Sequence, residues 1–107
     1  MKIKFKENQN DLFIRLEGDF GLDRIDNFKL FKRTLKDISH RDQKRVFLDL
    51  KRTYFLDSAM IAVLLVIKNK LEAGGREFHV INTSDYFSKL VQIIHLDQNL
   101  NITPQYK

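Results

Sequence analysis

The chain has 107 residues, with 19 Lys or Arg against 14 Asp or Glu, a net charge of +5, and no cysteine. A chain of this length buries roughly 60–70% of the surface that its unfolded form exposes, which is enough for one hydrophobic core. We therefore expect residues 1–107 to form a single domain, and the lack of cysteine excludes disulfides, thiolate nucleophiles and cysteine-containing zinc sites.

The first third of the chain predicts a β-hairpin followed by a helix. Apolar residues alternate with polar ones around Ile3 and Phe5 and again from Leu12 to Leu16, and the sequence ENQND between them is typical of a turn. After Gly18, the segment from Leu22 to about Ser39 places its apolar residues along one helical stripe and several basic residues on the other side. The stripe consists of Ile25, Phe28, Phe31, Leu35 and Ile38.

The rest of the chain alternates strands and helices. VFLDL (46–50) and EFHVI (77–81) are short apolar segments that predict buried strands. The helix between them begins near Asp57 or Ser58 and ends at Gly74-Gly75, and a third helix begins near Thr83, Ser84 and Asp85 and continues to about Ile94. LNITP closes the domain, with a last short strand left open as an alternative.

Helical crossovers between successive strands impose parallel pairing with right-handed connections. The expected fold is therefore an α/β domain that opens with a β-hairpin and has a mixed sheet of four to five strands packed with three to four helices. The longest apolar run, Ala59 to Ile67, is nine residues, too short to cross a bilayer, and the N-terminal MKIKFKENQN lacks the apolar core of a signal peptide. We expect no transmembrane segment and a cytoplasmic location.

The helix that starts near Ser58 is more apolar than one face of a sheet requires. Residues 59–67 contain no polar residue, so the first two turns are apolar all round. One explanation is a central helix buried on several sides. The other is a docking face, in which Ala59, Met60 and Val63 form a small exposed apolar patch beside Ser58.

Three segments carry a resemblance to a known family: LEGDFGLDRID, VFLDLKRTYFLDSAMIAVLLVIKNKLEAGG and VINTSDYFSKLVQIIHLD. Together they resemble the STAS domain, the fold of bacterial anti-sigma-factor antagonists. The most specific part is an ordered set: a strand, an aromatic-rich loop with Tyr54-Phe55, the pair Asp57-Ser58, an apolar helix, and Gly74-Gly75. The resemblance covers nearly the whole chain.

The resemblance implies a phosphorylation site and a partner. In the family, the serine that directly follows the aspartate at the start of this helix is phosphorylated by a serine kinase of the histidine-kinase-like ATPase fold, which is often also the anti-sigma factor. Ser58 matches that serine, and Asp23 in Gly21-Leu22-Asp23 matches an aspartate that lies near it. The expected partner-binding surface consists of Asp23, Asp57, Ser58, Ala59, Met60, Val63, Thr83 and Ser84.

Two other resemblances remain open. Antagonists usually continue the Asp-Ser pair with another Ser or Thr and then Gly, whereas this chain has Ala59 and Met60. Asp-Ser followed by apolar residues also resembles the STAS proteins of stressosome-type scaffolds. Asp-Ser-Ala is similar to the small STAS subunits that dock on the ATPase of lipid-transport ABC systems, where phosphorylation is not required. In that case Ser58 is only a helix cap, which is worth about 1 kcal/mol.

Other classes of function have weaker support. Basic residues of the first helix and the segment after it form a stripe that suits nucleic acid, an anionic membrane or an acidic protein partner. Since both signs of charge are interspersed and no nucleic-acid motif is present, we interpret it as a solvated face and expect no direct nucleic-acid binding. The spacing of His40, His79 and His95 does not suit a metal site, and no phosphate-binding loop or nucleophile motif is present. We expect no metal, no cofactor and no enzymatic activity.

Overall fold

The computed structural model describes residues 2–19, 24–55, 58–95, 100–103 and 105. In chain order, its elements are β1 (Lys2–Glu7), β2 (Asp11–Asp19), α1 (Ile25–Ile38), β3 (Arg45–Asp49), β4 (Thr53–Phe55), α2 (Ser58–Ala73), β5 (Glu77–Ile81), α3 (Asp85–Ile93) and β6 (Ile102–Thr103). The predicted hairpin, the three helices and the strand at 77–81 are confirmed. The start of the first helix was expected at Leu22, which lies outside the described residues.

The sheet is mixed, as predicted. Its strand order is β1-β2-β3-β5-β6, with β1 antiparallel to β2 and the other neighbours parallel. The closing strand, left open in the sequence, is present as β6. The sequence did not predict β4, which lies in the aromatic-rich loop before α2 and pairs with the end of β2 outside the main strand order. Thr53 fixes this pairing, since its Oγ1 donates a 2.8 Å hydrogen bond to the Leu16 carbonyl.

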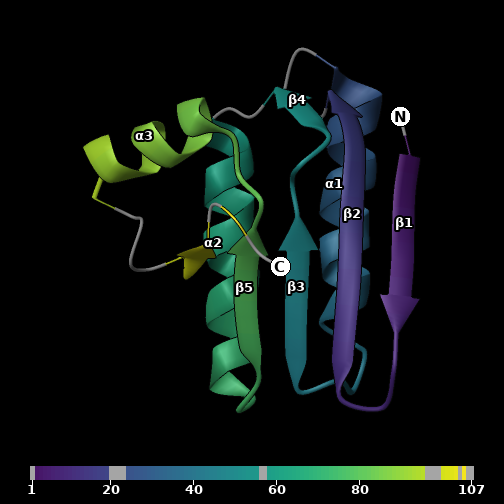
Figure 1. Ribbon diagram of the computed structural model, residues 1–107. Helices are drawn as coiled ribbons and strands as arrows, with labels where there is room; N and C mark the ends of the chain where they lie inside the picture. Colours follow the sequence, from purple (N-terminus) through teal and green to yellow (C-terminus); the bar gives the residue numbers. More distant parts are fainter. Residues whose placement is uncertain (1, 20–23, 56–57, 96–99, 104, 106–107) are drawn as a thin grey trace.

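Helices α1 and α2 cover one face of the sheet, and both lie behind it in Figure 1. The alternation of β2 explains which face they cover, because Leu12, Ile14 and Leu16 are fully buried while their neighbours are partly exposed. Val46 and Leu48 of β3 extend the same buried layer. The main core therefore lies between the sheet and these two helices.

The other face of the sheet has no helix in front of β1, β2 and β3 in Figure 1. Phe13, Phe47 and His79 lie side by side there on three neighbouring strands. The Phe13 and Phe47 rings stack with their centroids 4.7 Å apart. The Phe47 and His79 rings also stack, with their centroids 5.1 Å apart. Because each flank of Phe47 is covered by a ring, this side chain is buried without a helix over it.

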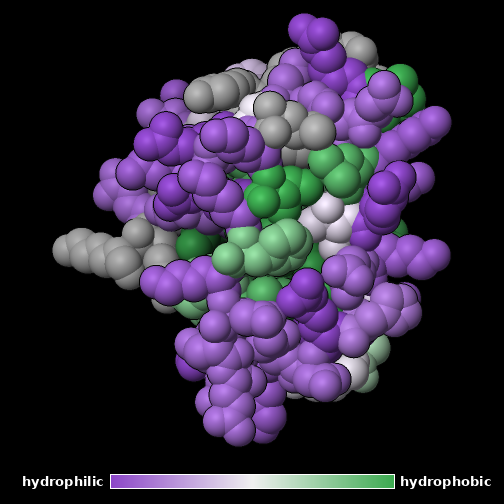
Figure 2. Space-filling model, turned by 90° about the vertical axis from the view of Figure 1, so that its right-hand side faces the viewer, coloured by the Kyte–Doolittle hydropathy of each residue, from purple (hydrophilic) through white to green (hydrophobic). Residues whose placement is uncertain are grey.

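The edge strand β1 borders the side of the molecule that faces the viewer in Figure 2, where hydrophobic residues form a band between hydrophilic regions. Phe5 is the large side chain of β1 that stays 46% exposed, and the Arg41 guanidinium lies 5.2 Å from its ring centroid. Lys2, Lys4 and Lys6 put charge on the free edge, which disfavours pairing with another strand. Among the described residues, no helix is long and apolar enough to span a membrane.

Candidate protein-binding site at the start of α2

The beginnings of the three helices lie at one end of the sheet. Strands β2, β3 and β5 are parallel, so their carboxyl ends share an edge, and α1, α2 and α3 follow β2, β4 and β5 in the chain. Figure 1 shows all three helices starting toward that end. This arrangement brings the predicted site residues of α2 and of the β5–α3 junction to the same end of the molecule. In parallel sheets, binding sites are commonly found at this edge.

Ser58 is the first residue of α2 and is exposed. Its hydroxyl has no hydrogen-bond partner among the described residues. The first turn of α2 contains no acidic side chain, whereas α1 has Asp26 and α3 has Asp85 in that position. The partial positive charge at the start of α2 is therefore not offset from within its own first turn.

The two predicted acidic neighbours, Asp23 and Asp57, lie outside the described residues. Their proximity to Ser58 stays a prediction. The structure does describe how α1 is attached to the end of β2, since the Asn27 Nδ2 donates a 2.6 Å hydrogen bond to the Asp19 carbonyl. Asn27 was not predicted as a site residue from the sequence. The one indication of its role was its place as a polar residue next to the apolar stripe of that helix.

The predicted apolar patch beside Ser58 needs a correction. Met60 is fully buried and belongs to the core, so it is not an exposed contact residue. Each helical residue turns about 100° from the one before it, so Met60 points away from the side on which Ser58 is exposed. Ala59 and Val63 are half-buried against the core and keep part of their surface open. The apolar part of the site is therefore smaller than expected.

Both explanations of the apolar helix hold for part of α2. Met60, Ile61, Leu64, Ile67 and Leu71 are buried. Ala62 is exposed, and Val66 has 65% of its surface exposed. The exposed apolar side chains thus lie further along α2 than the predicted patch.

Thr83 and Ser84 fix the start of α3. Thr83 is buried, and its Oγ1 lies 2.6 Å from the Ser88 Oγ. Ser84 is exposed and is the N-cap of α3, since its Oγ accepts a 3.1 Å hydrogen bond from the Phe87 amide. Thr83 therefore supports the local structure, and Ser84 keeps an exposed surface at this end of the molecule.

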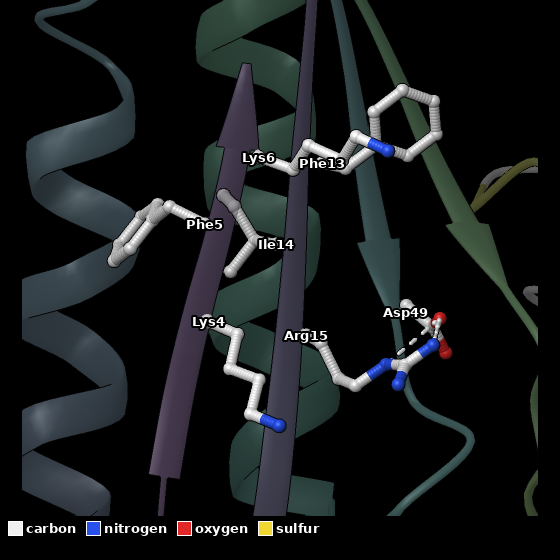
Figure 3. Close-up of a pocket in the computed structure, with 7 residues that line it drawn as sticks. All are labelled: Lys4, Phe5, Lys6, Phe13, Ile14, Arg15 and Asp49. Atoms are coloured by element: carbon white, nitrogen blue, oxygen red, sulfur yellow. Dashed lines mark hydrogen bonds and ion pairs between the residues drawn. The ribbon is translucent and has the colours of Figure 1, made fainter.

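A separate hollow of about 400 Å³ borders β1 and β2. Figure 3 shows Lys4, Lys6 and Arg15 around it, with Arg15 reaching toward Asp49. The Arg15 Nη2 lies 3.2 Å from the Asp49 Oδ2, and the Asp49 Oδ1 accepts a 2.9 Å hydrogen bond from the Lys51 amide. Both carboxylate oxygens of Asp49 therefore have partners within the protein. No group of three or more potential metal ligands exists in the described part of the chain.

The family model described as "Mlab, STAS domain" matches residues 3–104. The chain belongs to the STAS domain family. An anti-sigma factor antagonist from Mycobacterium paratuberculosis has a similar structure, with a TM-score of 0.83 and 13% identity over 97% of this chain and 86% of that one. An anti-sigma-factor antagonist (STAS) domain protein from Planctomyces limnophilus has a TM-score of 0.79 and 16% identity over 98% and 91% of the two chains.

A third similar structure is the Bacillus cell fate determinant SpoIIAA in its phosphorylated form, with a TM-score of 0.69 and 17% identity over 91% of this STAS domain and 86% of that chain. At these identities the likeness shows the fold. The predicted α/β architecture with an opening hairpin is confirmed by it. All three of these similar structures are of anti-sigma factor antagonists, since SpoIIAA is also described as one.

Proposed function

We propose that this STAS domain is a cytoplasmic regulator that binds an anti-sigma factor with serine kinase activity and is released from it when Ser58 is phosphorylated. It acts by binding rather than by catalysis. The observation that carries the proposal is the exposed Ser58 hydroxyl at the start of α2, in a first turn without an acidic side chain. Antagonists of similar structure, one of them in a phosphorylated form, support it.

The start of α2 suits a phosphate. Phosphorylation adds about −1.5 to −2 charges and three acceptor oxygens at pH 7. Amide groups at a helix N-terminus and the helix dipole favour an anion there by about 0.3–1 kcal/mol. The phosphorylated protein is therefore expected to stay folded, so the modification changes binding.

The same phosphate opposes docking. A partner that covers Ser58 also covers the half-buried Ala59 and Val63. Bringing a doubly charged group into contact with apolar surface removes its water, and this desolvation costs more than an ordinary contact returns. Ser58→Asp is expected to weaken the complex, and Ser58→Ala is expected to retain it.

The modification itself can be tested by mapping phosphate on protein recovered from its own cells. We expect phosphate on the peptide that contains Ser58 and its loss in Ser58→Ala. Ser84→Ala is the matched control, because Ser84 is also an exposed serine at the start of a helix. Phosphate that persists in Ser58→Ala, or is lost only in Ser84→Ala, contradicts the proposal.

A second candidate is an accessory subunit of a transporter ATPase, as in lipid-transport ABC systems, that binds constitutively through the same end of α2. It is favoured by Ala59 and the buried Met60, which occupy the positions where antagonists usually carry a second hydroxyl residue and a glycine. A complex that is insensitive to Ser58→Asp would support this candidate.

A further inference from the structure

A groove of about 520 Å³ lies between α1 and α2 on the side of the helices away from the sheet. Its apolar part comes from α2, where Ala62 and Val66 lie one turn apart and Val63 and Ile67 lie beside them. Val66 has 65% of its surface exposed. A soluble helix normally turns polar residues outward at such positions, so this strip is an unpartnered apolar surface.

The rim of the groove is entirely basic. The polar side chains that line it are Lys32, Arg33, Lys36 and Lys70, and no carboxylate is among the lining residues. None of the four forms an ion pair with another described residue, although Lys68, on the same helix as Lys70, pairs with Glu72 at 2.9 Å. Basic side chains from both helices therefore surround the apolar strip, and no acidic side chain in the groove lining neutralises them.

The geometry specifies the kind of occupant. Lys70 follows Val63 by seven positions, which is about 10 Å along the helix axis. A hollow between two helices receives apolar side chains at helical spacing, as in helix-in-groove recognition. The basic residues on both walls then require carboxylates on both sides of that apolar stripe.

We propose that the α1–α2 groove binds an acidic amphipathic helix of a protein partner, with its apolar stripe on Val66 and its carboxylates facing Lys32, Lys36 and Lys70. This surface is additional to the Ser58 site, and its occupation does not depend on the state of Ser58. A flat anionic membrane is a poorer match, since the apolar strip lies within a hollow between two basic walls.

The probe is a synthetic helical peptide of about three to four turns with leucines at helical spacing and glutamates on both flanks. Isotope-labelled protein is titrated with it and followed by NMR. We expect shifts centred on the groove residues and weaker binding at higher salt. The charge-reversed variant Lys36→Glu/Lys70→Glu should lose about tenfold or more in affinity, while Lys89→Glu, an exposed helical lysine outside the groove, should change it less than about twofold.

Three outcomes would overturn the proposal. One is equal binding of a peptide in which lysines replace the glutamates, and another is equal loss in Lys89→Glu and in the groove variant. The third is binding to phosphatidylglycerol vesicles with no binding of the acidic peptide. Ser58→Asp and Ser58→Ala are titrated in parallel, and equal affinity for the peptide is expected, so failure at the groove is distinguishable from failure of the Ser58 switch.

Discussion

Ser58 and Met60 show how two residues of one helical turn take opposite roles. Ser58 is exposed at the first position of α2, and Met60 is fully buried two residues later. The sequence predicted Ser58 as a site residue on a family pattern, and it also predicted an exposed Met60. Without a polar residue in positions 59–67, hydrophobic periodicity does not indicate which side of this helix faces the core.

Replacing Met60 with alanine tests its assignment to the core. We expect Met60→Ala to lower the free energy of unfolding by about 2–4 kcal/mol, because it leaves a cavity among fully buried side chains. Ala62→Ser, on the exposed side of α2, should change the free energy of unfolding by less than about 0.5 kcal/mol. Urea unfolding of the variants measures both values, and equal stability of Met60→Ala and wild type would refute the assignment.

The two glycines after α2 have different roles. Gly75 has a φ of +77°, which side chains rarely adopt, while an added methyl group at Gly74 meets its nearest atom, the Leu71 carbonyl oxygen, at an ordinary 3.5 Å. We expect Gly75→Ala to destabilise the protein by about 1–2 kcal/mol. Gly74→Ala should have little effect or a small stabilising one. Thermal unfolding of the pair checks this, and the reverse order of stabilities would contradict it.

At the scale of elements, the sequence predicted those whose signals are local. The hairpin follows from alternation around a polar turn, and α2 ends where Gly74-Gly75 predicted. Strand β4 was missed because Thr53–Phe55 has only three residues, too few to show the alternation of apolar and polar residues that predicts a strand. It forms a strand because it pairs with β2. Its stabilising hydrogen bond joins Thr53 to Leu16, which are far apart in the sequence.

The hairpin also carries a pH-dependent contact. The Lys4 ammonium, whose Nζ lies 3.2 Å from the Glu17 Oε2, holds the pKa of Glu17 below its usual value of 4.5, with burial opposing it. A lowered pKa means that the folded state favours the carboxylate. The contribution is therefore present above pH 4.5 and is lost as the pH falls through the folded-state value.

Lys4→Ala measures this contact. We expect it to be less stable than wild type near neutral pH, with the difference shrinking once the pH falls well below 4.5, where Glu17 is protonated. Lys6→Ala is the matched control, since Lys6 is exposed on the same strand and forms no ion pair with a described residue. Urea unfolding across pH gives both curves, and a Lys4→Ala difference that stays constant into acid would argue against the assignment.

At the scale of the whole molecule, the order of strands and helices predicted the mixed sheet, with its parallel pairs, and the α/β fold. The distribution of surface properties needed the structure. The basic stripe of the first helix was interpreted as a solvated face, and only the packing of α1 beside α2 shows that Lys32, Arg33 and Lys36 border an apolar groove. The open sheet face with its Phe13–Phe47–His79 row likewise depends on register between strands.

In the proposed function, phosphorylation of Ser58 controls binding to a kinase-type partner. The most direct measurement is a quantitative pull-down from native cytoplasm with wild type, Ser58→Ala and Ser58→Asp in parallel, followed by identification of the retained proteins. We predict a kinase-type ATPase retained by wild type and by Ser58→Ala and lost by Ser58→Asp. A transporter ATPase retained equally by all three would contradict the claim and would make Ser58 only part of the helix start.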